Sequence, residues 1–563
     1  MNPSDPVVAR TGGQLLIDAL KGHGVEMVFG VPGESYLAAL DALYDARDSI
    51  RFVVCRQEGG AADMADAYGK LTGRPGVCFV TRGPGAANAS IGIHTAYQDS
   101  TPLVLFVGQV GNGVVEREAF QEIDHRRMFG QMAKWVAQID RPERVPEMVS
   151  HAFHLAVSGR PGPVVLALPE DMLRATAASA DTPRYQRVAA HPGADDMNRL
   201  RTLLSQARQP FLVLGGGGWN AQACSDIQAF AEANALPVGC VYRCQDLFDN
   251  RHLNYSGDIS VGLNPALERR IRNADLLLAV GPRLGEWTTS HYALIDIPRP
   301  KQKFVHVHTG AEELGRVYQG DLLINSGMPE FSEMARRLPP VKAEWTAFTK
   351  AARAEYEAWQ KPVAVPGQLN LSEVMAFLRE RLPAQTIVTC GAGAYVVWVH
   401  RFYRFTGFRT QLGPTSGAMG YGVPSAVAAK LLHPDRPVIS FSGDGCFLMN
   451  GQELATAMQY DAKVIFIVIN NGIYGTIRMN QESHYPARVI GTDLRNPDFA
   501  ALARAYGLHG EVVEETAEFA AAFERAWNAR TAALLELRVD PDAISPTATL
   551  SAIRAHALRR KSN

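Results

Sequence analysis

The chain has 563 residues, of which 47% are hydrophobic and 20% are charged, and its formal net charge is −1. This length allows two to four domains with buried cores. The near-neutral charge gives no reason to expect a nucleic-acid or membrane partner held by bulk charge. The polar start from Met1 to Arg10 lacks a signal-peptide core, and no apolar run reaches the length of a membrane span. The seven cysteines form no Cys-x-x-Cys pair, which predicts reduced thiols in a cytoplasmic protein without a zinc site.

Short β-branched runs alternate with longer helical patterns along the whole chain, and this alternation predicts parallel sheets with crossover helices. The predicted strands are Phe52–Cys55, Val77–Val80, Leu103–Val107, Val164–Leu168, Phe211–Leu214, Leu276–Val280, Phe304–His308, Thr386–Thr389, Val438–Ser442, Val464–Ile469 and Leu534–Val539. Linkers are predicted at Ala175–Gly193 and, with a helical centre, at Pro339–Leu369. We therefore expect an α/β protein of three doubly wound parallel-sheet domains, at 1–180, 190–340 and 365–545. The sequence leaves three interpretations of the tail after Ser545: a lid, a partner contact or a disordered segment.

In the first third, a predicted strand ends at Glu58, and Gly59–Ala62 begins a helix. A carboxylate at the start of a helix needs no functional explanation, because the helix dipole alone stabilises it there. Three further segments stand out in this third. They are an early glycine loop at Phe29–Gly33, a tight turn at Arg82–Asn88 and the segment Ala119–Asp124.

The middle third contains the run Gly215–Gly218 after a predicted strand. It is not a clean dinucleotide fingerprint, because Asn220 stands in the place of the third glycine.

The last third contains the strongest chemical motif. The strand Val438–Ser442 leads into Gly443-Asp444-Gly445, a helix follows, and the strand Val464–Ile469 ends in Asn470-Asn471. A right-handed crossover makes the two strands parallel and brings Asp444 and Asn471 to the same sheet edge, where such folds bind ligands. One carboxylate and one amide oxygen suit a hard divalent ion that also binds phosphate. The glycines allow close approach of a diphosphate to the helix N-terminus.

These residues resemble the signature of thiamine diphosphate enzymes, which is Gly-Asp-Gly, a spacer of some two dozen residues, and Asn-Asn. The resemblance implies thiamine diphosphate and Mg²⁺, with the ion bound by Asp444, Asn471 and the backbone carbonyl of Ile473. It assigns to Glu58 a hydrogen bond to the aminopyrimidine ring, which makes the cofactor a carbon nucleophile. It implies a pyrimidine-binding first domain, a central domain and a diphosphate-binding last domain. The two halves of one site come from different subunits, so a homodimer or homotetramer is expected.

The likeness is greatest to the acetolactate synthase group and extends over nearly the whole chain. It implies that the Gly417 carbonyl accepts from the exocyclic amine of the cofactor and that Met419 wedges between its two rings. It makes Gln121 an active-site candidate. Substrate contacts are expected from Glu34, Phe120, Gln121, Ile477 and Asn480. The remaining expected cofactor contacts are Pro32, Gly33, Asn88, Gly391, Ala392, Gly393, Ala394, Tyr395, Gly443, Gly445, Cys446, Tyr474 and Gly475.

Four positions depart from the flavin-containing synthases. Trp287 stands where they usually carry an arginine that receives a carboxylate, and indole cannot replace the guanidinium fork. Glu170 replaces a lysine, Asn480 replaces a tryptophan, and His308 replaces the acid that usually holds the flavin ribose. These departures weaken the case for an anionic acceptor, and they weigh against FAD.

We therefore predict a carboligase that decarboxylates a 2-oxo acid, with pyruvate or 2-oxobutyrate as the default donor, and joins the product to a carbonyl acceptor. One alternative is a simple 2-oxo acid decarboxylase or a 2-hydroxyacyl-CoA-type lyase on the same scaffold. Others are a flavin oxidase and a non-catalytic regulatory paralogue, although the intact Glu58, Asp444 and Asn471 argue against the last.

Overall fold

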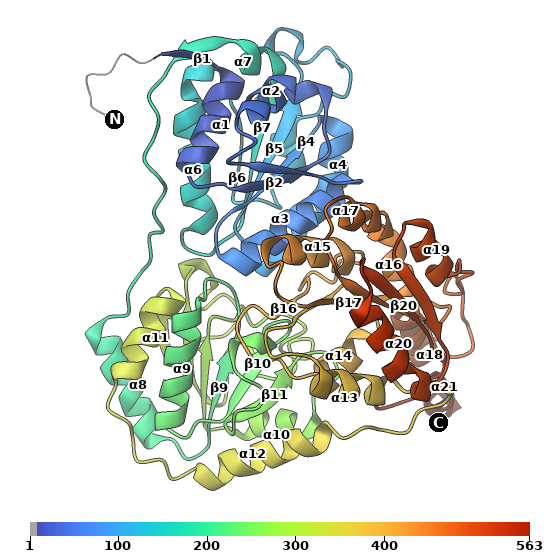
Figure 1. The fold of residues 1–563 in the computed structure, drawn as a ribbon. Coiled ribbons are helices and arrows are strands. Elements are labelled where there is room, and N and C mark those ends of the chain that lie inside the picture. Colours follow the sequence, from blue (N-terminus) through green and yellow to red (C-terminus); the bar gives the residue numbers. More distant parts are fainter. Residues whose placement is uncertain (1–7, 563) are drawn as a thin grey trace. The chain divides into compact units, whose positions relative to one another are not determined.

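The protein was analysed as a computed structural model that describes residues 8–562 (Figure 1). These residues form two compact units, divided in the chain after Val188. The first unit contains one sheet of six strands and the second contains two, and every neighbouring pair within these three sheets is parallel. The predicted α/β class with three parallel sheets is therefore confirmed.

The sheet of the first unit has the strand order β3-β2-β4-β5-β7-β6. Helices α1, α2 and α6 pack over one face around a shared apolar core, and α3 and α4 pack together against β2, β4 and β5. A short antiparallel pair, β1 and β8, joins the two ends of the unit. The bounds are β1 Ala9–Thr11, α1 Gly12–Gly22, β2 Met27–Gly30, α2 Leu37–Asp45, β3 Arg51–Val54, α3 Glu58–Thr72, β4 Gly76–Val80, α4 Gly83–Asp99, β5 Leu103–Gln109, α5 His125–Phe129, β6 Trp135–Gln138, α6 Val145–Val157, β7 Pro163–Pro169, α7 Glu170–Arg174 and β8 Thr176–Ala178.

The segment Arg82–Asn88 is not the predicted tight turn. It is the first part of α4, which begins at Gly83 directly after Arg82. Pro84 lies in the first helical turn, where a proline is tolerated because the missing N–H would have no partner inside the helix. The Gly-Pro-Gly pattern that indicated a turn therefore starts a helix.

The first sheet of the second unit has the order β11-β10-β9-β12-β13-β14. It is followed by helix α12, which is the helical centre predicted for the second linker. The bounds are α8 Ala194–Gln206, β9 Pro210–Leu214, α9 Ala221–Ala233, β10 Val238–Val241, β11 Tyr255–Ile259, α10 Pro265–Asn273, β12 Leu276–Val280, β13 Lys303–His308, β14 Leu322–Asn325, α11 Met328–Arg337 and α12 Thr346–Trp359.

The second sheet of this unit has the order β16-β15-β17-β18-β20-β19. Strands β17 and β18 are neighbours in parallel register, with Gly443 opposite Ile469, so their carboxyl ends lie at one edge as the motif predicted. The bounds are α13 Leu371–Arg381, β15 Ile387–Cys390, α14 Val396–Phe402, β16 Gln411–Leu412, α15 Gly422–Leu432, β17 Val438–Gly443, α16 Asp444–Asn450, α17 Leu454–Gln459, β18 Ile465–Asn470, α18 Gly475–His484, α19 Phe499–Ala505, β19 His509–Val513, α20 Thr516–Asn528, β20 Ala533–Arg538 and α21 Leu550–Ser562.

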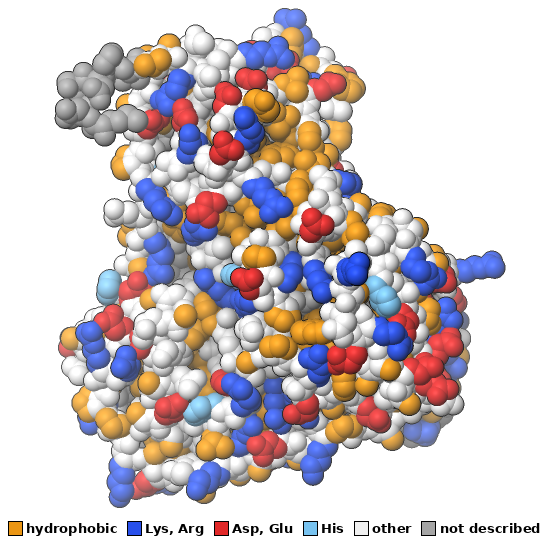
Figure 2. Space-filling view, in the orientation of Figure 1, with side chains coloured by type: hydrophobic (Ala, Val, Ile, Leu, Met, Phe, Trp, Pro, Cys, Tyr) orange, Lys and Arg blue, Asp and Glu red, His pale blue; other side chains and the backbone are white. Residues whose placement is uncertain are grey.

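The surface agrees with the near-neutral charge. Figure 2 shows basic and acidic side chains interspersed over the visible face. No helix within residues 8–562 has the length and apolar character needed to cross a membrane. None of the seven cysteines, all of which lie within the described residues, is in a disulfide, and the described residues contain no cluster of three His, Cys, Asp or Glu side chains that could hold a metal ion.

Candidate cofactor and substrate site

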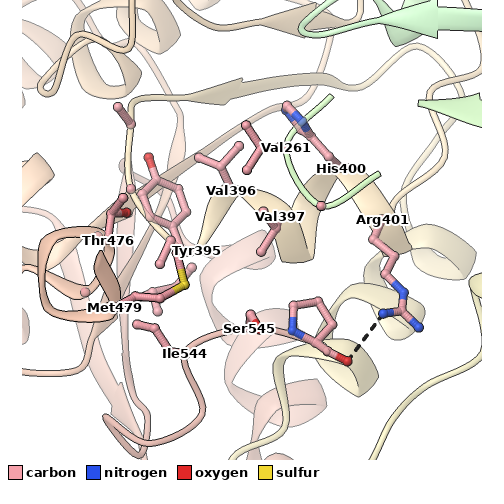
Figure 3. Close-up of a pocket in the computed structure, with 18 of the residues that line it drawn as sticks. Val261, Tyr395, Val396, Val397, His400, Arg401, Thr476, Met479, Ile544 and Ser545 are labelled. Atoms are coloured by element: carbon pink, nitrogen blue, oxygen red, sulfur yellow. Dashed lines mark hydrogen bonds between the residues drawn. The ribbon is translucent and has the colours of Figure 1, made fainter. Parts of the chain in front are cut away.

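A cavity of about 530 Å³ lies in the second unit, at the carboxyl edge of the sheet that contains β17 and β18. Its walls come from α14, the starts of α16 and α18, the segment before α21 and the edge of the central sheet (Figure 3). The structure brings most of the residues predicted in the last third together here. Those that line the cavity are Ala392, Gly393, Ala394, Tyr395, Gly417, Met419, Gly443, Asp444, Gly445, Cys446, Asn471, Ile473, Tyr474, Gly475 and Ile477.

Asp444 begins α16 directly after β17, and its side chain is buried in the cavity wall. Its carboxylate accepts hydrogen bonds from the backbone N–H groups of Gly445 at 2.8 Å and Gly472 at 2.9 Å. Burial raises the pKa of Asp444 from its ordinary value, and these bonds act against that rise. A buried carboxylate that several donors keep in one orientation, without a basic side chain as partner, is suited to a cation.

Asn496 is a further residue of this site that the sequence motif did not indicate. Its side-chain amide donates to the Asp444 carboxylate at 2.8 Å and to the Asn470 side-chain oxygen at 2.9 Å. Asn470 in turn donates to the buried Glu536 on β20 at 2.9 Å. Hydrogen bonds thus connect Asp444 to two neighbouring strands, and Asn496 fixes the rotamer of the carboxylate.

Asn471 and Ile473 lie in the turn between β18 and α18. The Asn471 side-chain oxygen accepts from the backbone N–H of Ile473 at 3.2 Å. Ile473 forms an isolated antiparallel bridge with Asp493. The two hydrogen bonds of this bridge are made by the neighbouring Gly472 carbonyl and Tyr474 N–H, so they do not use the Ile473 carbonyl. The carboxylate, amide oxygen and backbone carbonyl expected for Mg²⁺ are therefore all at one cavity wall, and this oxygen-only donor set fits that ion.

The cavity also fits a diphosphate. Helices α14, α16 and α18 all begin at its wall, and the residue before each helix makes no capping bond with its side chain. In α16 the Asp444 carboxylate accepts from the Gly445 N–H, so the other first-turn N–H groups are the ones open to a ligand. The backbone N–H groups of uncapped first turns are donors for phosphate oxygens. Gly445 is required by close packing, because a Cβ atom there would lie 2.5 Å from the Tyr474 ring.

Gly417 and Met419 lie where the cofactor rings are expected. Gly417 has a φ of +70°, a left-handed conformation that favours glycine, and no atom would lie within 4 Å of an added Cβ. Its backbone is therefore open to the cavity. Met419 is partly buried against the core of the last sheet, and it also lines the cavity.

Gly391 and Asn480 do not line the cavity. Gly391 lies behind its wall, where the Arg243 guanidinium donates to its carbonyl at 2.6 Å and a Cβ atom would lie 2.3 Å from the Cys446 sulfur. Asn480 is exposed on α18, and its carbonyl is within hydrogen-bond distance of the His484 ring at 3.0 Å.

The first unit contains the predicted acid. Glu58 is the first residue of α3, and its carboxylate accepts from the Asn88 side chain on α4 at 2.8 Å. The Gln57 side chain caps the helix by accepting from the Gly60 N–H, so Glu58 is not needed as the cap. Pro32 and Glu34 are exposed, and Gly33 packs against Thr81.

Gln121 lies in a loop between β5 and α5, not in a helix. It has a φ of +64°, and its carbonyl accepts from the N–H of Gly83 at 3.0 Å. Phe120 is 72% exposed, and its carbonyl accepts from Arg82, which also pairs with Glu170 at 2.8 Å. The acid that departs from the synthase pattern at Glu170 therefore has a cation as partner.

Two departures lie in the central part of the second unit. Trp287 lines the cavity and is 44% exposed. His308 is buried at the end of β13 and contacts Gly310 through its Nδ1 atom at 3.0 Å. At the same edge of this sheet, the indole N–H of Trp219 donates to the carbonyl of Gly215 in the glycine run at 2.8 Å, and Arg283 pairs with Glu313 at 3.1 Å. These groups bond within the protein, and the expectation against FAD stays a prediction.

Comparison with known proteins agrees with this geometry. Residues 10–128, 197–333 and 391–537 match the N-terminal TPP binding domain, the central domain and the C-terminal TPP binding domain of thiamine pyrophosphate enzymes. The acetolactate synthase large subunit of Corynebacterium glutamicum is 32% identical over 92% of this chain and 84% of its own length. The acetolactate synthase isozyme 2 large subunit of Escherichia coli is 30% identical over 94% of this chain and 95% of its own length. The chain therefore belongs to the thiamine pyrophosphate enzyme family, in its acetolactate synthase-like group of carboligases and decarboxylases.

Proposed function

We propose that the protein decarboxylates a 2-oxo acid and joins the remaining acyl unit to a carbonyl acceptor, with thiamine diphosphate and Mg²⁺. The 2-oxo acid loses its carboxylate as carbon dioxide. Its C2 atom then bonds to the carbonyl carbon of the acceptor, whose oxygen takes up a proton, and the product is a 2-hydroxy ketone or an acetohydroxy acid. The observation that carries this proposal is the cavity that unites Asp444, Asn471 and Ile473 below uncapped helix starts.

In the proposed site, Asp444, Asn471 and the Ile473 carbonyl hold Mg²⁺. The first turns of α16 and α18 would receive the diphosphate, while Gly417 and Met419 would contact the rings. When bound, thiamine diphosphate supplies a carbon nucleophile and an electron sink. Mg²⁺ would neutralise the diphosphate charge, and Asn496 holds the Asp444 carboxylate in one orientation.

Glu58 is proposed as the acid that exchanges a proton with the pyrimidine ring, and Asn88 orients its carboxylate. Gln121 and Phe120 are proposed to face the substrate from the same domain, together with Glu34. We further propose that the domain of Glu58 serves the cavity of a second copy, so that the active form is a homodimer or homotetramer. The exposed apolar side chains Leu37 on α2 and Ile91 on α4 are compatible with burial in such an assembly.

The test is to incubate the purified protein with thiamine diphosphate, Mg²⁺ and a panel of 2-oxo acids, with and without aldehyde acceptors, and to identify the products. A 2-hydroxy ketone or acetohydroxy acid is the expected product. Free aldehyde alone would instead support the simple decarboxylase, and cleavage of a 2-hydroxyacyl-CoA would support the lyase. A protein that binds the cofactor but turns over none of these substrates would be the regulatory paralogue.

A further inference from the structure

Arg243 is a buried cation that lies directly behind one segment of the cavity wall. It follows strand β10, and its guanidinium donates to the Gly391 carbonyl at 2.6 Å and to the Cys390 carbonyl at 3.4 Å. A third bond goes to the Tyr242 hydroxyl at 3.1 Å. Gly413 packs so closely against the group that a Cβ atom there would lie 2.1 Å from its Nη1 atom. The guanidinium is therefore held in one place and in one orientation.

No carboxylate pairs with Arg243 in the part of the chain that the structure describes. Its three acceptors are uncharged, and its buried Nε has no acceptor among the described residues. The buried Arg353 of the same unit differs, because it donates to the carbonyls of Asn250 and His252 but also pairs with Glu357 at 2.8 Å. A guanidinium keeps its proton in proteins, and a buried charge without a counter-ion is destabilising. A negatively charged ligand nearby would remove this cost.

The bond to Gly391 also sets the direction of the next backbone N–H group. In a planar trans peptide the carbonyl and the N–H point in opposite directions. Because the Gly391 carbonyl faces Arg243, the N–H of Ala392 points away from it. Ala392 and Gly393 both line the cavity, and within residues 8–562 their N–H groups have no acceptor. Arg243 therefore holds an unpaired donor of the cavity wall in a fixed direction, away from the interior behind it.

This end of the cavity also lacks a cation on its surface. The cationic side chains in the lining are His400 and Arg401, which belong to the last three residues of α14, whereas the segment Gly391–Gly393 precedes that helix. At the proposed metal site, the Asp444 carboxylate offsets part of the charge of Mg²⁺, so a bound diphosphate keeps an excess of negative charge. A buried positive charge behind the segment is weakly screened and acts across a single peptide layer.

We propose that Arg243 is a positioning residue for thiamine diphosphate, which fixes the segment Gly391–Gly393 and, through it, favours the negative charge of the diphosphate. This inference rests on the proposed binding of thiamine diphosphate. It goes beyond that binding by giving a role to a residue after β10 that does not line the cavity. In the rival interpretation Arg243 only ties the chain after β10 to the last sheet, and the charge of the ligand then has no influence on the effect of its removal.

The test is to measure by calorimetry how thiamine diphosphate and thiamine monophosphate bind to the full-length apoprotein at one fixed Mg²⁺ concentration. Arg243→Met should weaken binding of the diphosphate about tenfold, the size expected for one weakly screened charge, and binding of the monophosphate less than about threefold. Arg243→Lys keeps the charge without the planar fork and should recover most of the lost affinity for the diphosphate. If Arg243→Met does not fold, Arg243→Gln takes its place, since it also removes the charge and can still donate to Gly391.

Arg353→Met is the matched control, because it also removes a buried arginine that donates to two backbone carbonyls, but at a distance from the glycine segment in the chain fold. It should lower the melting temperature and leave the affinities for both ligands unchanged. The inference is wrong if Arg243→Met weakens both ligands by the same factor, if Arg243→Lys recovers nothing, or if Arg353→Met gives the same pattern.

These binding measurements do not depend on turnover, so they separate the inference from the proposed reaction. If the effect of Arg243→Met depends on ligand charge while the unaltered holoenzyme consumes no 2-oxo acid, the role of Arg243 stands and the proposed reaction fails. If the unaltered holoenzyme forms the carboligation product but the ratio of the two affinities is the same in Arg243→Met, the reaction stands and the role of Arg243 is wrong.

Discussion

Replacing Asn496 by leucine tests whether the hydrogen-bond network behind Asp444 prepares the metal site. Leucine has the same branched heavy-atom skeleton as asparagine, with bulkier methyl ends, but cannot donate, so Asn496→Leu removes the bonds to Asp444 at 2.8 Å and to Asn470 at 2.9 Å. Asp444 keeps its two backbone donors, Gly445 and Gly472, and the fold of the loop is maintained by the bond from Leu494 to the Gly472 carbonyl. The expected result is therefore a misoriented ligand in a folded protein.

The magnitude follows from the charge on the acceptor. A hydrogen bond to an ionised group contributes about 1.5–3 kcal/mol, and loss of a group that orients a metal ligand lowers metal affinity about ten- to a hundredfold. We expect the Mg²⁺ concentration for half-saturation to rise by that factor at a fixed thiamine diphosphate concentration. Titration of the apoprotein, followed by tryptophan fluorescence or calorimetry, measures it.

The control for this variant is Asn528→Leu, which removes an asparagine bond to the Glu524 carbonyl on the exposed face of α20. It should bind Mg²⁺ like the unaltered protein. The reasoning is refuted if Asn496→Leu binds Mg²⁺ with unchanged affinity while its melting temperature is also unchanged. An equal loss in both variants would point to general destabilisation instead.

Four shorter predictions concern the cofactors and the pH response. Glu58→Gln should lower kcat at least about a hundredfold while calorimetry still detects thiamine diphosphate binding, and wild-type turnover would contradict its role. EDTA should abolish activity and release the cofactor on dialysis, and added Mg²⁺ should restore both. The purified protein should show no flavin absorbance, so a yellow preparation would overturn our view of the central sheet. Burial lowers the pKa of His306 to about 4, so between pH 6.5 and about 4 the unfolded chain binds more protons than the native one. The free energy of unfolding should then fall with decreasing pH, by up to about 3 kcal/mol from this residue, as urea denaturation would measure, and His306→Gln should reduce the slope.

The central strands could be predicted from the sequence because burial on both faces makes them continuous apolar runs. Strands β12 and β17 illustrate this, since their predicted and observed bounds agree to within one residue. The edge strand β3 was predicted as Phe52–Cys55, but the edge strands β14, β16 and β19 gave no such signal. Strand β16 has only two residues, and β14 and β19 carry partly exposed or polar positions because one side of each has no neighbouring strand.

The residues of the candidate site likewise separate into those that the sequence could place and those that it could not. Asp444 and Asn471 could be placed together because they follow consecutive parallel strands, and the handedness of the crossover does not depend on the rest of the fold. Asn496 could not be placed, because it reaches Asp444 only after the chain folds back along Gly472–Tyr474.

The position of the C-terminal segment also has a consequence for how the protein is made. Residues Ile544 to Thr547 line the cavity, and Ile544 packs with Ile473 and Leu550 in a small apolar cluster next to the proposed metal ligands. The glycine segment that begins at Gly391 leaves the ribosome well before this wall does. The pocket therefore exists only as an open half until residues 544–547 have also been made, and cofactor loading follows their synthesis. A fusion or truncation near α21 would then impair cofactor retention before it impaired folding of the sheet.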